Sequence, residues 1–181
     1  MNNENRKIIF LFPLLIYLIS ALVGCTSSQE RRILVVHSYE ETYTAYPEFN
    51  RLIAKQFKKE GVNADIRTLY LDCESYKEET ELKRMRYLLD SVSGDWRPEV
   101  ILVNEDQATY SLLKCGDPLV KEVPVVFAGV NYPNWELLKQ YPNATGFHDK
   151  IGFVQNAEMA RKLFGDSVRP VSYTHLTLPT T

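Results

Sequence analysis

The 181-residue sequence lacks the motifs that mark several common classes of α/β protein. It contains neither a GxxxxGK[ST] phosphate loop nor a GxGxxG fingerprint, which excludes the usual nucleotide sites of such folds. Lysines and arginines are dispersed and the formal net charge is −2, so the positive patch of a nucleic-acid-binding protein is missing. We therefore expect no nucleic-acid partner, and we expect neither a cofactor nor a catalytic residue in this chain.

Cysteine is also scarce, with three residues in the whole chain. Cys73 follows a predicted strand, whereas Cys115 ends a predicted helix and should lie near the opposite edge of the sheet. A disulfide needs Cα atoms within roughly 7 Å of each other. We therefore predict that both are free, buried thiols.

The third cysteine, Cys25, closes an N-terminal segment that resembles a secretory signal with a bacterial lipobox. Arg6 and Lys7 precede an apolar stretch over residues 8–21, and Leu22-Val23-Gly24-Cys25 follows it. The resemblance implies export, cleavage before Cys25 and acylation of its thiol, with residues 1–25 as signal peptide and 26–31 as tether. An ordinary signal peptide, or an uncleaved anchor with Cys25 present by chance, is the alternative. Each of these interpretations predicts an exported protein that is membrane-anchored on the periplasmic side of a bacterial membrane or released there.

The last residues differ from everything before them, because residues 171–181 contain no charged side chain and no helical period. They look like translated sequencing adapter: the transposon-end primer GTC TCT TAT ACA CAT CTG ACG CTG CCG ACG reads as Val171 through Thr180. We interpret residues 170–181 as an adapter-derived artefact and exclude them from fold reasoning. The natural protein is expected to continue beyond residue 169, so the chain is expected to be a truncated fragment.

Between these ends, five apolar runs rich in β-branched residues each lead into a polar or glycine-containing cluster, with helix-like sequence between most of them. The runs are 33–36 before His37, Ser38 and Tyr39; 66–71 before Asp72; 100–103 before Asn104, Glu105 and Asp106; 125–127 before Gly129 and Asn131; and 144–147 before His148 and Asp149. Such runs suit strands buried on both faces. The pattern predicts an α/β fold with a doubly wound parallel sheet over residues 32–150.

Helical spacing and capping residues predict the elements between the strands. Helices are expected over residues 47–59 and 77–92, after a cap at Asp106, from Pro133, and over residues 151–164. Parallel strands need crossover connections, so every polar cluster falls at a carboxyl end, on one common edge of the sheet. Open α/β sheets bind their ligands at that edge.

The candidate ligand-binding residues are the polar and glycine residues of this edge: His37, Ser38, Tyr39, Asn104, Glu105, Asp106, Gly129 and Asn131. They offer hydrogen-bond donors and acceptors, and Tyr39, Tyr43, Tyr46 and Trp135 add stacking faces. Capping and turn formation are the structural alternative for these positions. A hydrolase site from Ser38, His37 and Asp72 is a weaker alternative, because Ser38 lacks the GxSxG elbow. No metal site is expected, since His37, His148 and Asp149 have no characteristic ligand spacing.

Three segments resemble the ABC transporter substrate-binding protein family of periplasmic-binding-protein-like proteins, especially the version fused ahead of membrane-bound sensor histidine kinases. They are ILVVHSY at residues 33–39, the strand from Pro98 to Asn104, and VPVVFAGVN at residues 123–131. The resemblance implies a two-lobed type-1 fold with ligand between the lobes. Residues 32–150 would be the first lobe, and residues 151–169 a crossover helix toward a second lobe that this chain lacks.

Three functions are compatible with these features. The leading expectation is a ligand-sensing input domain of a transmembrane (hybrid) sensor histidine kinase in two-component signal transduction, acting as a homodimer. The second is a stand-alone ABC transporter substrate-binding lipoprotein that works with a permease. The third is a secreted hydrolase. For the first two, a sugar, an amino acid or a short peptide would suit the visible half of the cleft, and the membrane would be reached through the lipid anchor or a downstream helix.

Overall fold

The computed structural model describes residues 29–150, 152–167 and 169. The chain divides into one unit at residues 1–30 and a second at residues 31–181. The predicted signal peptide, the acylation site Cys25, residues 26–28 of the tether and the adapter-like segment lie outside the described residues. Residues 32–150, the predicted first lobe, lie within the second unit.

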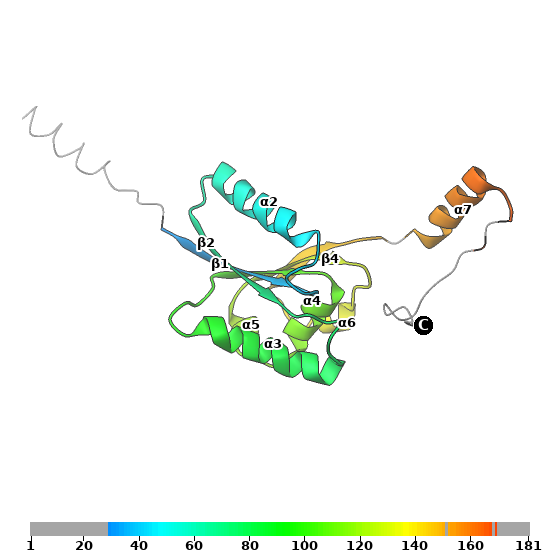
Figure 1. Cartoon of the computed structure of the whole chain (residues 1–181). Coiled ribbons are helices and arrows are strands. Elements are labelled where there is room, and N and C mark those ends of the chain that lie inside the picture. The colour runs from blue at the N-terminus through cyan, green and yellow to red at the C-terminus, as the bar shows by residue number, and fades with distance from the viewer. Residues whose placement is uncertain (1–28, 151, 168, 170–181) are drawn as a thin grey trace, which may run out of the picture. The chain divides into compact units, whose positions relative to one another are not determined.

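A five-stranded, all-parallel sheet forms the centre of this unit (Figure 1). Its strands are β1 (Arg31–His37), β2 (Ala64–Tyr70), β3 (Val100–Asn104), β4 (Val125–Val130) and β5 (Ala144–His148), in the order β2-β1-β3-β4-β5. The predicted parallel α/β sheet is thus confirmed. The order reverses direction between β1 and β3, which makes that pair the topological switch point.

Six helices connect or follow the strands among the described residues: α2 (Tyr46–Lys59), α3 (Glu78–Ser93), α4 (Asp106–Lys114), α5 (Leu119–Glu122), α6 (Trp135–Leu138) and α7 (Phe153–Phe164). Five of them match predicted helices to within a few residues. The four-residue α5 was not predicted, because one helical turn is too short to show a periodic apolar pattern. Figure 1 shows α2 on one side of the sheet and α3 and α5 on the other, as in a doubly wound fold.

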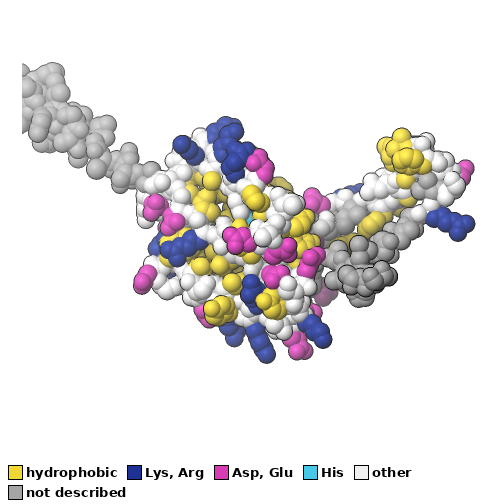
Figure 2. Space-filling model, in the orientation of Figure 1, with side chains coloured by type: hydrophobic (Ala, Val, Ile, Leu, Met, Phe, Trp, Pro, Cys, Tyr) yellow, Lys and Arg dark blue, Asp and Glu magenta, His cyan; other side chains and the backbone are white. Residues whose placement is uncertain are grey.

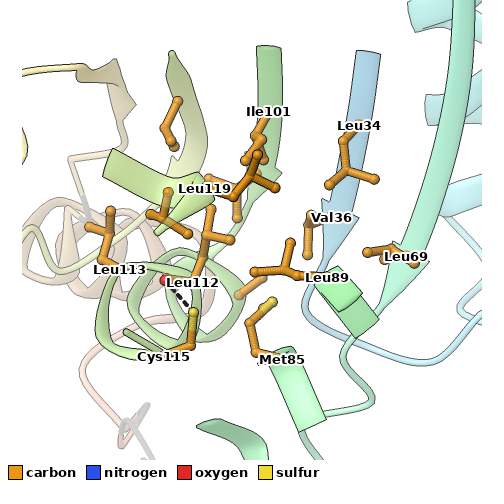
Figure 3. Packing of buried hydrophobic residues seen from close by; sticks show 14 of the residues in the cluster. Leu34, Val36, Leu69, Met85, Leu89, Ile101, Leu112, Leu113, Cys115 and Leu119 are labelled. Carbon is orange, nitrogen blue, oxygen red and sulfur yellow. Dashed lines mark hydrogen bonds between the residues drawn. The ribbon is translucent and has the colours of Figure 1, made fainter. Parts of the chain in front are cut away.

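Strand β1 is buried on both of its faces. Leu34 and Val36 belong to one large buried cluster together with side chains from α3 and α4, among them Met85 and Leu112 (Figure 3). Val35, between them, is also buried but lies outside that cluster, on the α2 face. Because successive side chains point to opposite faces, a central strand covered on both sides must be apolar at every position. This is the continuous run seen in the sequence.

The two described cysteines are both free and buried, as predicted. Cys73 follows β2, whereas Cys115 caps the carboxyl end of α4, with its Sγ 3.1 Å from the carbonyl oxygen of Leu112 (Figure 3). Burial raises the pKa of the Cys73 thiol to about 12 and also raises the pKa of Cys115. Neither thiol is therefore poised for reaction at neutral pH.

Helix α7 forms where the amphipathic pattern predicted it, and none of its residues is buried. Its exposed apolar side chains are Phe153, Val154, Met159, Leu163 and Phe164. A helix with an uncovered apolar stripe normally buries it against another element. That α7 begins the crossing into a second lobe stays a prediction. Within the part of the chain that the structure describes, no helix has both the length and the apolar character needed to cross a membrane.

Candidate functional site

The carboxyl ends of β1 and β3 bring together residues that are more than sixty positions apart in the sequence. Ser38 Oγ donates a 3.0 Å hydrogen bond to the backbone oxygen of Asn104. Gly129, at the end of the neighbouring β4, lies so close that a Cβ there would be 3.1 Å from Asn104 Oδ1. The three predicted clusters after β1, β3 and β4 therefore meet at one place, which is the switch point of the sheet.

Ser38 itself is a structural residue at this junction. Its side chain has 0% exposure, and its Oγ accepts a 2.9 Å hydrogen bond from the backbone nitrogen of Ala108 while donating to Asn104. Ser38 thus satisfies one of the free N–H groups in the first turn of α4, a task that N-terminal helix capping residues usually perform. In this arrangement Ser38 has no surface to offer a ligand.

His37 is buried as well, with 0% exposure. Its Nε2 lies 2.8 Å from Asn50 Oδ1, its ring stacks on Tyr46 at 3.9 Å between centroids, and its Nδ1 has no partner among the described residues. Burial lowers the pKa of His37, so the ring is neutral at pH 7. His37 therefore positions α2 against the sheet. It makes no hydrogen bond with Ser38 among the described side chains, and the nucleophile and base pair of the hydrolase alternative is not formed.

A chain of two hydrogen bonds links the loop after β1 to the end of β3. The backbone nitrogen of Tyr39 donates to Tyr46 Oη at 3.0 Å, and Tyr46 Oη donates to Glu105 Oε2 at 2.7 Å. Burial raises the pKa of Tyr46, and it raises the pKa of Glu105 although the Tyr46 bond opposes that shift. The Tyr46 hydroxyl thus fixes the Glu105 carboxyl group at the edge of the sheet.

Glu105 has a backbone conformation that side-chain-bearing residues rarely adopt, with φ 75° and ψ 169°. This region is nearly reserved for glycine, and a residue held there costs about 1–3 kcal/mol. Gly129 beside it also has a positive φ, of 65°, where glycine avoids the strain. Backbone strain of this kind persists only where the surrounding structure holds it, and its place at the topological switch point makes Glu105 a candidate for a functional side chain.

Asp106 does not cap its own helix as predicted. The N-cap position is Glu105, and the Asp106 carboxylate instead accepts hydrogen bonds from the backbone nitrogens of Asn131 and Tyr132, at 2.9 and 3.0 Å. The Asn131 side chain adds a third bond, at 3.2 Å. The prediction was wrong because an aspartate at the start of a helix is usually a local cap. Here Asp106 and Asn131 hold the loop after β4 in place.

Aromatic side chains form the exposed part of the site. Tyr39 and Tyr43 stack at 4.8 Å between centroids, and Tyr43 is 39% exposed. Across the edge, Tyr132 is 63% and Trp135 51% exposed. Tyr132 was not among the predicted residues although it directly follows one of them. Asn50, which holds His37, was also missed, and its spacing of four from Tyr46 on one face of α2 was the available signal.

The edge borders a hollow and offers no cluster of metal ligands. In the described ranges, no three His, Cys, Asp or Glu side chains come together in a way that could hold a metal ion. The hollow, at the end of β2, measures about 330 Å³ and is lined by Glu40, Glu41, Thr68, Leu69, Tyr70, Asp72, Arg84 and Leu88. The Arg84 guanidinium donates to the backbone oxygens of Leu71 and Tyr70, which uses two of its five N–H groups and holds it against the end of β2.

Comparison with known proteins supports the fold. No family model and no curated protein matches the sequence. The chain is similar to the crystal structure of a conserved domain protein from Vibrio cholerae O1 biovar El Tor str. N16961, with a TM-score of 0.57 and 17% identity over 75% of this chain and 44% of that one. This chain thus spans less than half of the Vibrio protein. The chain also has a likeness to the crystal structure of the lac repressor dimer bound to operator and the anti-inducer ONPF, with 16% identity over 72% of this chain and 34% of that one. The TM-score of 0.35 is too low for this likeness to carry an argument.

Proposed function

We propose that residues 32–150 are the first ligand-binding lobe of an extracytoplasmic sensor domain, the input region of a transmembrane sensor histidine kinase. The observation that carries the proposal is the strained Glu105 at the switch point, held by Tyr46 and flanked by the exposed ring of Tyr43. Ligands of open α/β sheets bind at this place. A carboxylate, an amide and aromatic faces would bind a small polar molecule in half of a cleft.

The mechanism would be closure of two lobes around the ligand. The described half of the site is an open edge, so a second lobe must supply the opposite wall. A ligand that contacts both lobes stabilises the closed state and shifts the population toward it. In a receptor, that shift would be passed to a membrane-spanning helix and then to the kinase. A homodimer would then be the functional unit.

A stand-alone ABC transporter substrate-binding lipoprotein is the second candidate, and the sequence Leu22-Val23-Gly24-Cys25 favours it. A lipid anchor at Cys25 suits a binding protein that delivers its ligand to a permease. A receptor that has its own membrane-spanning helix needs no such anchor. The two candidates share the first lobe and differ only in the domains that come after the second one.

Long-read sequencing of the gene through the codon for Arg169 separates these candidates. A second α/β lobe, a spanning helix and a kinase core would support the receptor, whereas a stop after the second lobe would support the lipoprotein. The absence of any second lobe would contradict both. The sequencing result also supplies the full-length protein for binding measurements.

The site itself is tested in that full-length protein with Asn104→Ala, whose side chain lies at the switch point beside Gly129. A ligand found by thermal shift screening of sugars, amino acids and short peptides should bind the variant about two- to twelvefold more weakly, as expected for one lost polar contact worth about 0.5–1.5 kcal/mol. The matched control is Asn63→Ala, an asparagine just before β2 at the opposite edge of the sheet. Equal affinity of Asn104→Ala and the unaltered protein would remove this edge from the binding site.

A further inference from the structure

The Glu105 carboxylate is half-buried and has no cationic partner among the described residues. Its hydrogen-bond partners are neutral: the Tyr46 hydroxyl donates to it, and the backbone N–H of Ser38 also acts on it as a donor that lowers its pKa. The ion pairs of the described residues involve Glu48, Glu78, Glu99, Glu122 and Asp166, and none reaches Glu105. Charges withdrawn from water are normally paired, because an unpaired buried charge is costly. Glu105 is an exception to that rule at the one place where a ligand is expected.

The surroundings of Glu105 are acidic rather than basic. Segments 38–45, 71–77, 104–107, 131–134 and 149–150, which follow the five strands, contain seven acidic residues and two lysines. The acids are Glu40, Glu41, Asp72, Glu74, Glu105, Asp106 and Asp149, and the lysines are Lys77 and Lys150. One further cation, Arg84 of α3, lines the hollow beside Glu40, Glu41 and Asp72. In Figure 2 acidic side chains gather on the side of the α/β body toward which the strands run. This distribution favours a positively charged ligand group.

The other acid of the switch point, Asp106, is already satisfied. Its two oxygens accept three hydrogen bonds from Asn131 and Tyr132, so it is committed to holding a loop. Glu105 by contrast accepts the Tyr46 hydrogen bond at one oxygen, Oε2, and hydrogen bonding from the Ser38 backbone N–H also opposes the rise of its pKa, which leaves part of its acceptor capacity unused. The second oxygen of a carboxylate can accept further donors. Glu105 is therefore the carboxylate of the switch point that remains able to receive hydrogen bonds from outside.

Tyrosine rings stand close to this carboxylate. Tyr46 binds Glu105 directly, and Tyr43 lies 4.9 Å from Tyr46 between ring centroids, with 39% of its surface exposed. Burial is the main cause that raises the pKa of Tyr39 to about 12, and the negative charge of Glu105 is the second cause. Aromatic faces attract cations and pack against apolar groups. A carboxylate beside tyrosine faces is a complementary surface for an organic cation.

We propose that the ligand of this site carries a protonated amine, whose N–H groups bind Glu105 and whose apolar part packs on Tyr43. This inference rests on the proposed ligand-binding function and names the chemical class of the ligand. The ammonium would supply the missing counter-charge, and its hydrogen bonds would be charge-assisted at both partners. Ligands of the same shape without a positive charge would leave Glu105 unpaired.

The test uses three probes of similar size and different charge: 2-phenylethylamine, 2-phenylethanol and 3-phenylpropionate. Each is titrated to millimolar concentration into the ¹⁵N-labelled two-lobed ligand-binding region of the full-length protein, which supplies both walls of the cleft, and backbone amide shifts are followed by NMR. The amine should shift the amides of Tyr39, Tyr43 and Glu105 and bind at least about tenfold more tightly than the alcohol, while the carboxylate should bind more weakly still. Glu105→Gln should abolish the preference for the amine. Glu60→Gln removes one charge at the far end of α2 and should leave that preference unchanged.

The outcomes separate this inference from the function on which it rests. Equal binding of all three probes at Tyr39 and Tyr43, unaffected by Glu105→Gln, would overturn the amine inference and keep a small-ligand site at this edge. Shifts confined to other regions, or no shifts from any probe, would overturn the amine inference, whereas the proposed function is tested separately by the ligand affinity of Asn104→Ala. Loss of the amine preference in Glu60→Gln as well as in Glu105→Gln would show a general charge effect and would also overturn the role of Glu105.

Discussion

Replacement of Ser38 by alanine should destabilise the domain far more than a serine at a ligand-binding edge would suggest. The variant leaves the Ala108 N–H without its acceptor, and a buried unpaired donor costs about 1–3 kcal/mol. It also removes the hydrogen bond to the Asn104 carbonyl, worth about 0.5–1.5 kcal/mol. Together these losses predict a decrease of about 1.5–4.5 kcal/mol in the free energy of unfolding. That is a large part of the stability of a typical single domain.

Urea denaturation followed by far-ultraviolet circular dichroism measures this loss. With an m-value of about 2 kcal/mol per M, the midpoint should fall by about 1–2 M while the slope stays unchanged. The control is Ser75→Ala, an exposed serine after β2 whose Oγ donates to Asp72, with an expected change within about 0.5 kcal/mol. A change below that limit in Ser38→Ala would refute the capping role of Ser38, and the residue would again be a candidate for ligand contact.

Three further predictions concern backbone space, charge and burial. Gly146→Ala should cost about 3 kcal/mol, because the new Cβ would lie 2.0 Å from a backbone oxygen of β4, whereas Gly94→Ala meets no atom within 4 Å and should be nearly neutral in the same urea assay. Burial raises the pKa of Glu105, so the folded state holds the carboxyl proton more tightly than the unfolded state does. The folded protein therefore loses stability as the pH rises above about 4.3, the usual pKa of a glutamate. In urea melts, Glu105→Gln should be more stable than the parent at pH 7, and this difference should vanish below about pH 4. In a variant with Cys25 replaced by serine, Ellman's reagent should react with Cys73 and Cys115 only after unfolding, because both thiols are buried. The assay is run at about pH 8, near the usual pKa of a thiol. Rapid reaction of the native chain would contradict the burial of these thiols.

The strands and most helices could be predicted because their signals are local. The continuous apolar run of β1 follows from burial on both faces, and the spacing of Leu82, Met85 and Leu89 follows from one buried helix face. Two apolar residues of that stripe, Met85 and Leu89, have 0% exposure, in agreement with the pattern. Even the place of the candidate site was predictable, since the carboxyl ends of parallel strands share one edge.

The roles of individual site residues were less predictable, because they depend on partners far away in the sequence. His37, Ser38 and Asp106 are polar residues at strand ends or a helix start, and that position alone suggested ligand contact or capping. In the folded chain His37 is held by Asn50, Ser38 serves the nitrogen of a helix seventy residues later, and Asp106 holds the loop after β4. No local pattern encodes these partners.

The sequence by itself determined the class of fold, the common edge of the polar clusters and the free state of Cys73 and Cys115, since hydrophobic periodicity and chain connectivity are enough for each of these conclusions. Only the tertiary structure decided which polar residues remain available at that edge. Packing buried His37 and Ser38, which removed them from the surface, and the pairing of β1 with β3 placed Tyr46 within hydrogen-bond distance of Glu105. The physical reason is that availability depends on burial and on hydrogen-bond partners, and both are set by contacts between segments distant in the chain.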